Sequence, residues 1–369
     1  MLKNVLKIFK KDSFIRRKIL LFASFFVIAG FYGCDTCNPG EGEIKDANDI
    51  FFSALSLNGS TPSIYAVSPN GNNLREIVKD GVIYGGPSRV KKFVFLREKS
   101  GIDTVLYIAT TDGSDSISRA TFSDIYKQLT VPVISPDGKY VSFYIGNGEV
   151  RIIANLSFQQ TATTYFYEGT EQSFSPDGKY LAFYEKDGIF GPIHIKVVSS
   201  DHPTEEIYYN RQFETLLKPI PGNATIDWSD DSRLIAYSCG DSEKTTDIIY
   251  IKDVFGNNDY ELKVKGIGAF MPSISPDDSS VAFAARDGNI WVRKIDEEKF
   301  FQITKVDSTI EYNLYPQWTN DGKEIFYLKY YRDDAGKFGG SLEIINVQTR
   351  RVMVLSNNVF RGYKMRIKA

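Results

Sequence analysis

The stretch QSFSPDGKYLAFYEKDG, residues 172–188, has a close copy 40 residues earlier, PVISPDGKYVSFYIGNG at residues 132–148. The likeness includes the central turn and the hydrophobic pattern on both sides of it, so it indicates an internal repeat and not a shared composition. Whether the repeat carries catalytic residues or builds the fold decides how its Asp residues are interpreted.

Three more copies follow: IDWSDDSRLIAYSCGD from residue 226, PSISPDDSSVAFAARDG from residue 272 and PQWTNDGKEIFYLKYY from residue 316. A weaker copy with a shortened turn, GGPSRVKKFVFLREKSG, begins at residue 85. The Ser or Thr at the start of each turn lies at 135, 175, 229, 275 and 319, with spacings of 40, 54, 46 and 44 residues. A unit of this length suits four short strands.

The two best copies share the turn residues Pro136, Asp137, Gly138, Pro176, Asp177 and Gly178. The prolines fix φ near about −65° at the second turn position, and the Asp-Gly pairs tolerate left-handed dihedral angles. These residues therefore predict hairpin turns, and we interpret the two Asp residues as structural. A carboxylate site is the alternative interpretation.

After each turn, small residues alternate with large ones, as in a strand packed between two neighbouring sheets. A third strand and a shorter fourth strand follow in each unit, and the 22 Tyr and 26 Phe favour strands throughout. The fold class predicted is therefore all-β, a β-propeller of four-stranded antiparallel blades.

Blade number follows from the second strands, which begin near residues 51, 93, 141, 181, 235, 281 and 325. Seven second strands favour seven blades, but only six first strands precede a turn. The C-terminal VFRGYKMRIKA, residues 359–369, can supply the missing strand beside IFFSALSL at residues 50–57 and close the ring, hiding both edges of an open blade. Six blades with an irregular terminal strand pair are the alternative.

The segments ISPDGKYVSFY, FSPDGKYLAFY and ISPDDSSVAFA resemble the TolB-type propeller repeat, over about residues 50–358. The resemblance implies the propeller fold and a partner in the cell envelope. Residues 34–48 leave too little chain for the additional N-terminal domain of TolB, so its pairing with the Tol system is not carried over to this chain.

The N-terminal region predicts a secretory signal. MLKNVLKIFKKDSFIRRK contains seven Lys or Arg and one Asp, and ILLFASFFVIAGFYG then runs 15 residues without a charge to Cys34. This is shorter than the ~20 apolar residues of a spanning helix, although a short uncleaved anchor is an alternative. AGFYGC resembles the lipobox of bacterial lipoproteins, with Phe31 and Tyr32 departing from its usual Leu and small residue. The resemblance implies cleavage before Cys34 and lipid attachment to it.

The predicted division is thus a signal peptide at 1–33, a lipidated tether at 34–48 and the propeller at 49–369. A lipidated Cys34 cannot exchange disulfides, so its C-x-x-C pair with Cys37 is not interpreted as a redox site. Whether Cys37 and Cys239 pair stays open. The predicted location is the bacterial cell envelope, lipid-anchored, with the outer membrane or periplasmic face favoured.

Cleavage also changes the charge. Of 44 Lys plus Arg and 46 Asp plus Glu, residues 1–33 hold seven and one, which leaves 37 and 45 and a net charge of −8. An acidic chain without a basic run is a poor electrostatic match for nucleic acid or anionic lipid. Membrane association is therefore expected through the lipid anchor alone.

Catalytic motifs are missing from the sequence. No G-x-S-x-G elbow occurs, and the two histidines, His194 and His202, are too few for a histidine metal cluster, so we expect neither a cofactor nor a metal. The first function hypothesis is a monomeric, non-enzymatic envelope lipoprotein that binds a protein, peptide or glycan. The alternative is a carbohydrate-active lyase or glycosidase with paired acids at the central channel.

Two insertions provide candidate binding residues, because rigid scaffolds often position binding residues on loops. SSDHPTEEIYYNRQFETLLKPIPGNA and KYYRDDAGKFGG combine aromatic residues with Arg, a combination enriched in interfaces. The candidates are Tyr208, Tyr209, Arg211 and Phe213 in the first and Tyr330, Tyr331 and Arg332 in the second. They could equally be strand residues that face neighbouring blades.

Overall fold

The computed structural model describes residues 49–55, 62–85, 92–99, 103–114, 116–122, 132–145, 149–154, 164–186, 193–200, 206–209, 225–238, 248–256, 259–264, 266–306, 311–332, 338–357 and 359–364. The predicted signal peptide, Cys34 and the tether lie outside these ranges and stay predictions. No helix within the described ranges is long and apolar enough to cross a membrane.

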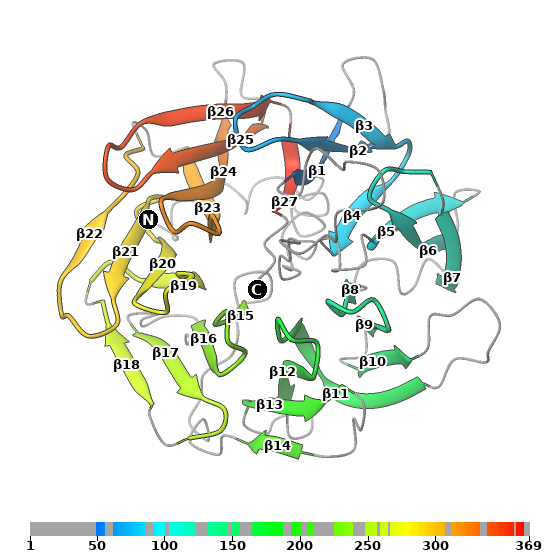
Figure 1. Ribbon diagram of the computed structural model, residues 1–369, viewed down its shortest axis with the longest axis horizontal. Coiled ribbons are helices and arrows are strands. Elements are labelled where there is room, and N and C mark those ends of the chain that lie inside the picture. Colours follow the sequence, from blue (N-terminus) through cyan, green and yellow to red (C-terminus); the bar gives the residue numbers. More distant parts are fainter. Residues whose placement is uncertain are drawn as a thin grey trace, which may run out of the picture.

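The described strands form an all-β propeller, with sheets arranged around a central axis (Figure 1). Five sheets have four strands each, all paired antiparallel, as the 40- to 54-residue repeat predicts. They comprise β27 (Val359–Lys364), β1 (Ile50–Leu55), β2 (Pro62–Val67) and β3 (Arg75–Val78); β4 (Val82–Gly85), β5 (Lys92–Lys99), β6 (Asp103–Thr110) and β7 (Ser116–Phe122); β15 (Ile226–Trp228), β16 (Leu234–Ser238), β17 (Ile248–Asp253) and β18 (Tyr260–Lys263); β19 (Ala269–Ile274), β20 (Ser280–Ala285), β21 (Ile290–Lys294) and β22 (Phe300–Gln302); and β23 (Tyr312–Trp318), β24 (Glu324–Arg332), β25 (Phe338–Asn346) and β26 (Val352–Asn357).

The remaining sector is one seven-stranded sheet in the order β14-β13-β12-β11-β10-β9-β8. Its strands are β8 (Val133–Ile134), β9 (Tyr140–Ile145), β10 (Glu149–Ala154), β11 (Thr164–Phe174), β12 (Tyr180–Lys186), β13 (Ile193–Ser199) and β14 (Glu206–Tyr209). The expectation of seven separate four-stranded blades is therefore wrong, because five are present in the described residues. The reason is β11, whose first half pairs with β10 and whose second half pairs with β12, so that one continuous strand joins what were expected to be two blades.

The ring closes as predicted. β27 pairs antiparallel with β1, with Phe51 opposite Tyr363 and Ile50 opposite Lys364. β1 is buried along Ile50 to Ala54, and Val359 is also buried. The last described strand of the chain thus completes the sheet that contains the first one, and β1 has a hydrogen-bonded neighbour on each side.

The repeat motif forms tight turns. The Ser175 hydroxyl donates a hydrogen bond to the Asp177 carboxylate over 2.6 Å, and the same carboxylate accepts the Lys179 backbone N–H over 3.0 Å. Gly178 has a φ of +77°, the left-handed region that the Asp-Gly turn requires. The turn around Pro136 repeats this geometry, with the Ser135 hydroxyl 2.6 Å from Asp137 and a φ of +68° at Gly138.

Neighbouring sheets are joined by buried apolar clusters and by a repeated Trp contact. Trp228 ends β15 and donates its indole N–H to the Ser173 carbonyl of β11 over 3.1 Å. Trp318 ends β23 and makes the equivalent bond to the Ser273 carbonyl of β19 over 3.0 Å. In both pairs the acceptor lies two residues before the Ser of the preceding turn, so the repeat also encodes the contact between sheets.

Candidate functional site

The structure distributes the predicted binding residues over two separate sheets. Tyr208 and Tyr209 belong to β14, whereas Arg211 and Phe213 lie outside the described residues. Tyr330 at the end of β24 packs against the apolar cluster between the β23–β26 and β27–β3 sheets, as a strand residue facing a neighbour does. The described members of the two predicted groups therefore belong to different sheets.

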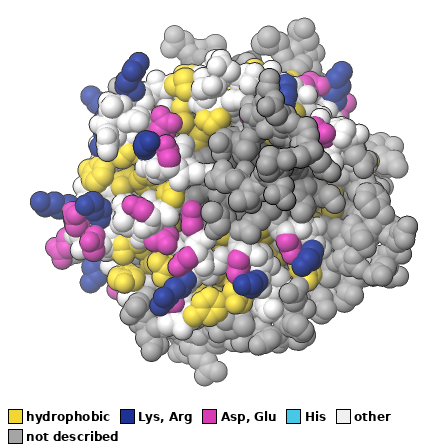
Figure 2. Space-filling view, in the orientation of Figure 1, with side chains coloured by type: hydrophobic (Ala, Val, Ile, Leu, Met, Phe, Trp, Pro, Cys, Tyr) yellow, Lys and Arg dark blue, Asp and Glu magenta, His cyan; other side chains and the backbone are white. Residues whose placement is uncertain are grey.

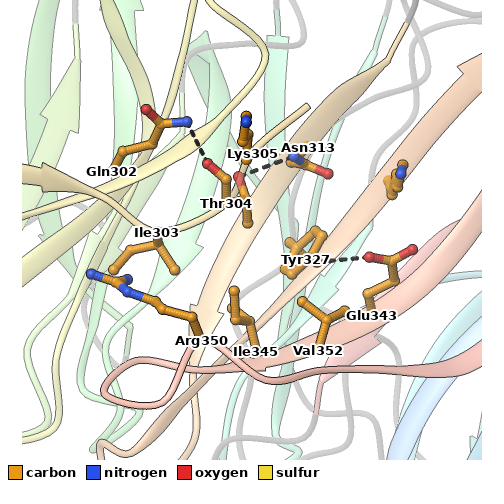
Figure 3. A pocket seen from close by; sticks show the side chains of 11 residues that line it. Gln302, Ile303, Thr304, Lys305, Asn313, Tyr327, Glu343, Ile345, Arg350 and Val352 are labelled. Carbon is orange, nitrogen blue, oxygen red and sulfur yellow. Dashed lines mark hydrogen bonds between the residues drawn. The ribbon is translucent and has the colours of Figure 1, made fainter. Parts of the chain in front are cut away.

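A different site lies between the β19–β22 sheet and the β23–β26 sheet, and we call it the β22–β26 cleft. It has a volume of about 690 Å³. Eleven residues line it: Gln302, Ile303, Thr304, Lys305, Asn313, Tyr327, Lys329, Glu343, Ile345, Arg350 and Val352 (Figure 3). This volume falls within the range of about 300–1,000 Å³ that is usual for small-molecule sites.

Strand register explains why polar residues gather here. Tyr327 of β24 is opposite Glu343 of β25, and Asn313 of β23 is opposite Lys329 of β24. Successive side chains of a strand point to opposite faces, so residues 327 and 329 share one face of the sheet. That face is turned towards the β19–β22 sheet, while the opposite face packs in an apolar cluster.

A buried carboxylate forms one end of the cleft. Glu343 is 8% exposed, and its two carboxylate oxygens accept hydrogen bonds from the Tyr327 hydroxyl over 2.7 Å and the Ser341 hydroxyl over 2.8 Å. Burial, with the adjacent Glu343 charge, raises the pKa of the Tyr327 phenol well above its usual range. Tyr327 thus stays protonated and continues to donate to Glu343.

Replacing Tyr327 with Phe should test this pair. We expect the free energy of unfolding to fall by about 1–3 kcal/mol near pH 7, because Glu343 loses a buried donor. The raised pKa in the folded state means that the unfolded chain releases the Tyr327 proton first, from about pH 10. Above pH 10 the free energy of unfolding of the wild type should therefore fall by up to about 1.4 kcal/mol per pH unit. The Tyr327→Phe variant should not show this fall. Urea unfolding of both proteins at pH 7 and pH 10.5 measures this, and a constant difference would contradict the assignment.

A threonine-centred network orders the wall next to this carboxylate. The Thr304 hydroxyl oxygen accepts the Ile290 backbone N–H over 2.8 Å and the Asn313 amide over 3.0 Å, and its proton points to the Asn289 side-chain oxygen at 3.4 Å. These bonds use the one donor and two acceptor positions of a hydroxyl and so fix the orientation of the Asn313 amide. The Asn313 side-chain oxygen is then left buried without a hydrogen-bond partner.

The cleft is bounded by cations with different partners. Lys329 pairs with Glu311 over 3.3 Å. Arg350 and Lys305 are exposed and have no ion-pair partner within the described part of the chain. The Arg350 guanidinium lies 5.4 Å from the centre of the Phe301 ring, and partial loss of solvent around it lowers the pKa of Arg350. Its φ of +61° is a left-handed value that costs a residue with a side chain more than glycine.

The cleft is thus polar at both ends and apolar in the middle. Figure 3 shows Arg350 towards one end and Glu343 towards the other, with Ile345, Val352 and Tyr327 between them. Spare lone pairs on Glu343 and Asn313 can accept hydrogen bonds from a ligand, and Arg350 can bind an anionic group. Chemically, this arrangement suits recognition of a molecule that carries both donors and a negative charge.

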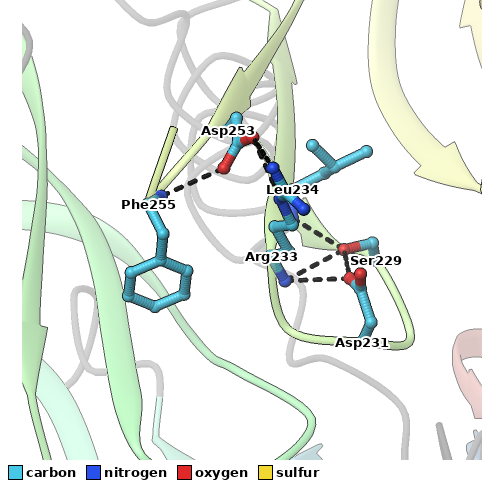
Figure 4. A network of polar contacts seen from close by, with 6 residues as sticks. All are labelled: Ser229, Asp231, Arg233, Leu234, Asp253 and Phe255. Carbon is cyan, nitrogen blue, oxygen red and sulfur yellow. Dashed lines mark hydrogen bonds and ion pairs between the residues drawn. The ribbon is translucent and has the colours of Figure 1, made fainter. Parts of the chain in front are cut away.

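A second polar network joins the turn between β15 and β16 to the end of β17 and serves the fold (Figure 4). Arg233 contacts one oxygen of Asp253 with two nitrogens, over 2.9 and 2.7 Å, and holds the pKa of that carboxyl below its usual value. The second Asp253 oxygen accepts the Phe255 backbone N–H over 3.1 Å. These bonds fasten a buried carboxylate and leave little capacity for a ligand.

Charge does not single out another site on the face shown in Figure 2, where acidic and basic side chains are interspersed. The repeat turns themselves hold ion pairs, Lys139–Asp137 at 3.1 Å and Lys179–Asp177 at 3.4 Å. Within the described ranges, no group of three or more His, Cys, Asp or Glu residues is placed to hold a metal ion.

Sequence reasoning missed the β22–β26 cleft because its residues come from ordinary strands and from the segments that follow or precede them. Thr304, Asn313 and Glu343 are separated in the chain and meet only through the packing of two sheets. One signal was available. Tyr327 and Lys329, like Ser341 and Glu343, are two residues apart in a strand, which places polar groups together on a face that should be apolar.

Comparisons with known proteins support the fold. A prolyl endopeptidase has a TM-score of 0.57 at 14% identity, over 93% of this chain and 52% of the other, so this chain spans about half of that enzyme. An oligogalacturonate lyase from Vibrio parahaemolyticus has a TM-score of 0.54 at 11% identity, over 85% and 86% of the two chains. No protein-family model and no curated protein matches the sequence.

TolB from Acinetobacter baumannii is also among the similar structures, with a TM-score of 0.48 at 16% identity over 86% of this chain and 80% of that one. Together the similar structures show a β-propeller scaffold, and at identities below 25% they show the fold alone.

Proposed function

We propose that this protein is a lipid-anchored protein of the bacterial cell envelope whose propeller binds a protein, peptide or glycan, with the β22–β26 cleft as the binding site. The observation that carries the proposal is that the buried, donor-stabilised Glu343 and the unpartnered oxygen of Asn313 belong to the lining of one cleft of about 690 Å³. Buried polar groups normally have partners, and a hydrogen-bond donor on a ligand can supply the partner that the Asn313 oxygen lacks.

Anchoring through Cys34 is tested by its replacement. Cys34→Ser should remain an unprocessed precursor and incorporate no labelled palmitate, because the thiol is the proposed attachment point. Gel mobility and palmitate labelling of both proteins measure this, with Cys37→Ser as the matched control that should be processed and labelled normally. A Cys34→Ser protein that is still cleaved and released at normal size would show that the lipoprotein assignment is wrong.

The binding role is tested in native envelope extracts. When the full chain is used as bait and cross-linked in the extract, a defined envelope component should be recovered with it. The Glu343→Gln variant should recover less of this component. Its unfolding should still be cooperative, which shows that the variant is folded. If the wild type retains nothing above a control bait, the binding-module proposal is wrong.

An enzyme remains the second candidate, favoured by the likeness of the fold to an oligogalacturonate lyase. In that case Glu343 would be an acid or base, and cleavage of an acidic oligosaccharide should occur and should be lost in Glu343→Gln. Product analysis of wild type and variant separates the candidates, because a binding module leaves the oligosaccharide intact.

A further inference from the structure

The edges of the sheets differ in how they are protected. Natural sheets shield exposed edges with charged residues, because an open row of N–H and C=O groups pairs with other chains. The outermost strands β3, β7, β14 and β18 each contain a charged residue: REIV, SISRATF, EIYY and YELK. The outermost strands β22 and β26, FFQ and VMVLSN, contain none.

These two uncharged edges belong to adjacent sheets and flank the same cleft. Gln302 of β22 lines it on one side and Val352 of β26 on the other. The absence of edge charge therefore coincides with the site that already holds a buried carboxylate and an unpartnered amide oxygen. Two independent features, one of the backbone edge and one of the side chains, point to the same place.

β26 is also unusually apolar for an exposed strand. Val352, Met353 and Val354 are 50%, 39% and 50% exposed. Val352 lies opposite Ile345 and Val354 opposite Glu343, so both valines share the face that lines the cleft. Phe301, 39% exposed, provides further apolar surface on the β22 side. Among the described strands β26 is the last of its sheet, so an extended segment beside it would find a hydrogen-bonding edge and apolar contacts at alternate positions.

We infer that an extended peptide segment of an envelope partner adds as a strand to the edge of β26, with apolar side chains at alternate positions facing the cleft and an acidic residue at the Arg350 end. The inference rests on the proposed binding function and specifies its ligand. Arg350 provides the charge complementarity, since it has no carboxylate partner in the described residues.

The test uses labelled, acetylated eight-residue peptides in which Thr alternates with Val, Ile, Leu or Phe. Each peptide carries a single Glu, at the N-terminal end in one set and at the C-terminal end in the other. Their binding to the full chain is measured by fluorescence anisotropy. Peptides N-methylated on the amides that pair with β26 should lose binding, whereas the same peptides methylated on the alternate amides should keep it, because strand addition uses one row of amides only.

Protein variants locate the site. Val354→Lys should weaken binding at least about tenfold, because it places a solvated charge on the edge. Tyr260→Lys, at a 40% exposed position on the outer strand β18, is the matched control and should bind like the wild type. Arg350→Gln should lose about tenfold for peptides with Glu at one end and little for those with Glu at the other, since the pair depends on position.

The inference would be overturned if no peptide binds the wild type, if Val354→Lys binds as well as the wild type, or if both N-methylated sets bind equally. A wild type that dimerises in sedimentation while Val354→Lys is monomeric would assign the edge to a second copy and also overturn it. If the wild type and Val354→Lys recover the same component from envelope extract, the partner binds at a place other than the β26 edge, and the proposed binding function stands. Capture by neither would count against the function itself.

Discussion

Deleting residues 359–369 should reduce the free energy of unfolding by several kcal/mol, a large share of the ~5–15 kcal/mol that stabilises a typical domain. The deletion removes β27, exposes the paired edge of β1 and uncovers the buried residues from Ile50 to Ala54. Thermal unfolding followed by circular dichroism measures the loss. We expect either a large drop in the midpoint or no cooperative transition.

A shorter truncation that ends at Lys364 keeps every described β1–β27 pair and is the matched control. Adding a synthetic peptide of residues 359–369 to the long truncation should raise its midpoint, because the peptide can pair with β1 in place of the missing strand. An unchanged midpoint for the long truncation would mean that β27 contributes nothing to closure.

The second large effect is expected at the contact between sheets that Trp228 makes. Trp228→Ala should cost about 3–5 kcal/mol, because it empties a buried indole site. Trp228→Phe retains most of the apolar volume but removes the donor to the Ser173 carbonyl, and should cost about 1–3 kcal/mol. Urea unfolding of the three proteins resolves these steps.

Trp291→Ala is the control, since Trp291 is only partly buried and its indole N–H bonds to the exposed side chain of Asp287 over 3.1 Å. It should cost clearly less than Trp228→Ala. Equal losses at the two positions would show that the indole contact between β15 and β11 has no special role, and that tryptophan removal is costly wherever it occurs.

The sequence allowed the propeller and its closure to be predicted because both depend on local chemistry. Pro176, Asp177 and Gly178 determine a turn within a few residues, and alternating large and small residues indicate a strand between two sheets. The continuous strand β11 was not predictable in this way. Its second half, EGTEQSF, reads as a first strand, but nothing in the residues indicates that the preceding outer strand runs into it without a break.

The cleft lay beyond sequence reasoning for a different reason. Glu343 and Thr304 line one cleft from two sheets, and their separation depends on how those sheets pack. The candidate binding segments were predicted from their content of aromatic residues and Arg. Such content is typical of interfaces, but it does not indicate which residues lie close together in the fold. The lack of charge in VMVLSN is visible in the sequence, but it indicates an unprotected edge only once the structure shows that β26 is the outermost strand of its sheet.

The shared strand β11 has a consequence for how the ring responds to stress. Each four-stranded sheet can open locally by losing contacts with its neighbours, but β8–β10 and β12–β14 are attached to the two halves of one strand. If one half of β11 is pulled out of register, the other half is displaced too. Hydrogen exchange in this sector should therefore show both halves losing protection together, as a single cooperative unit larger than any other in the ring.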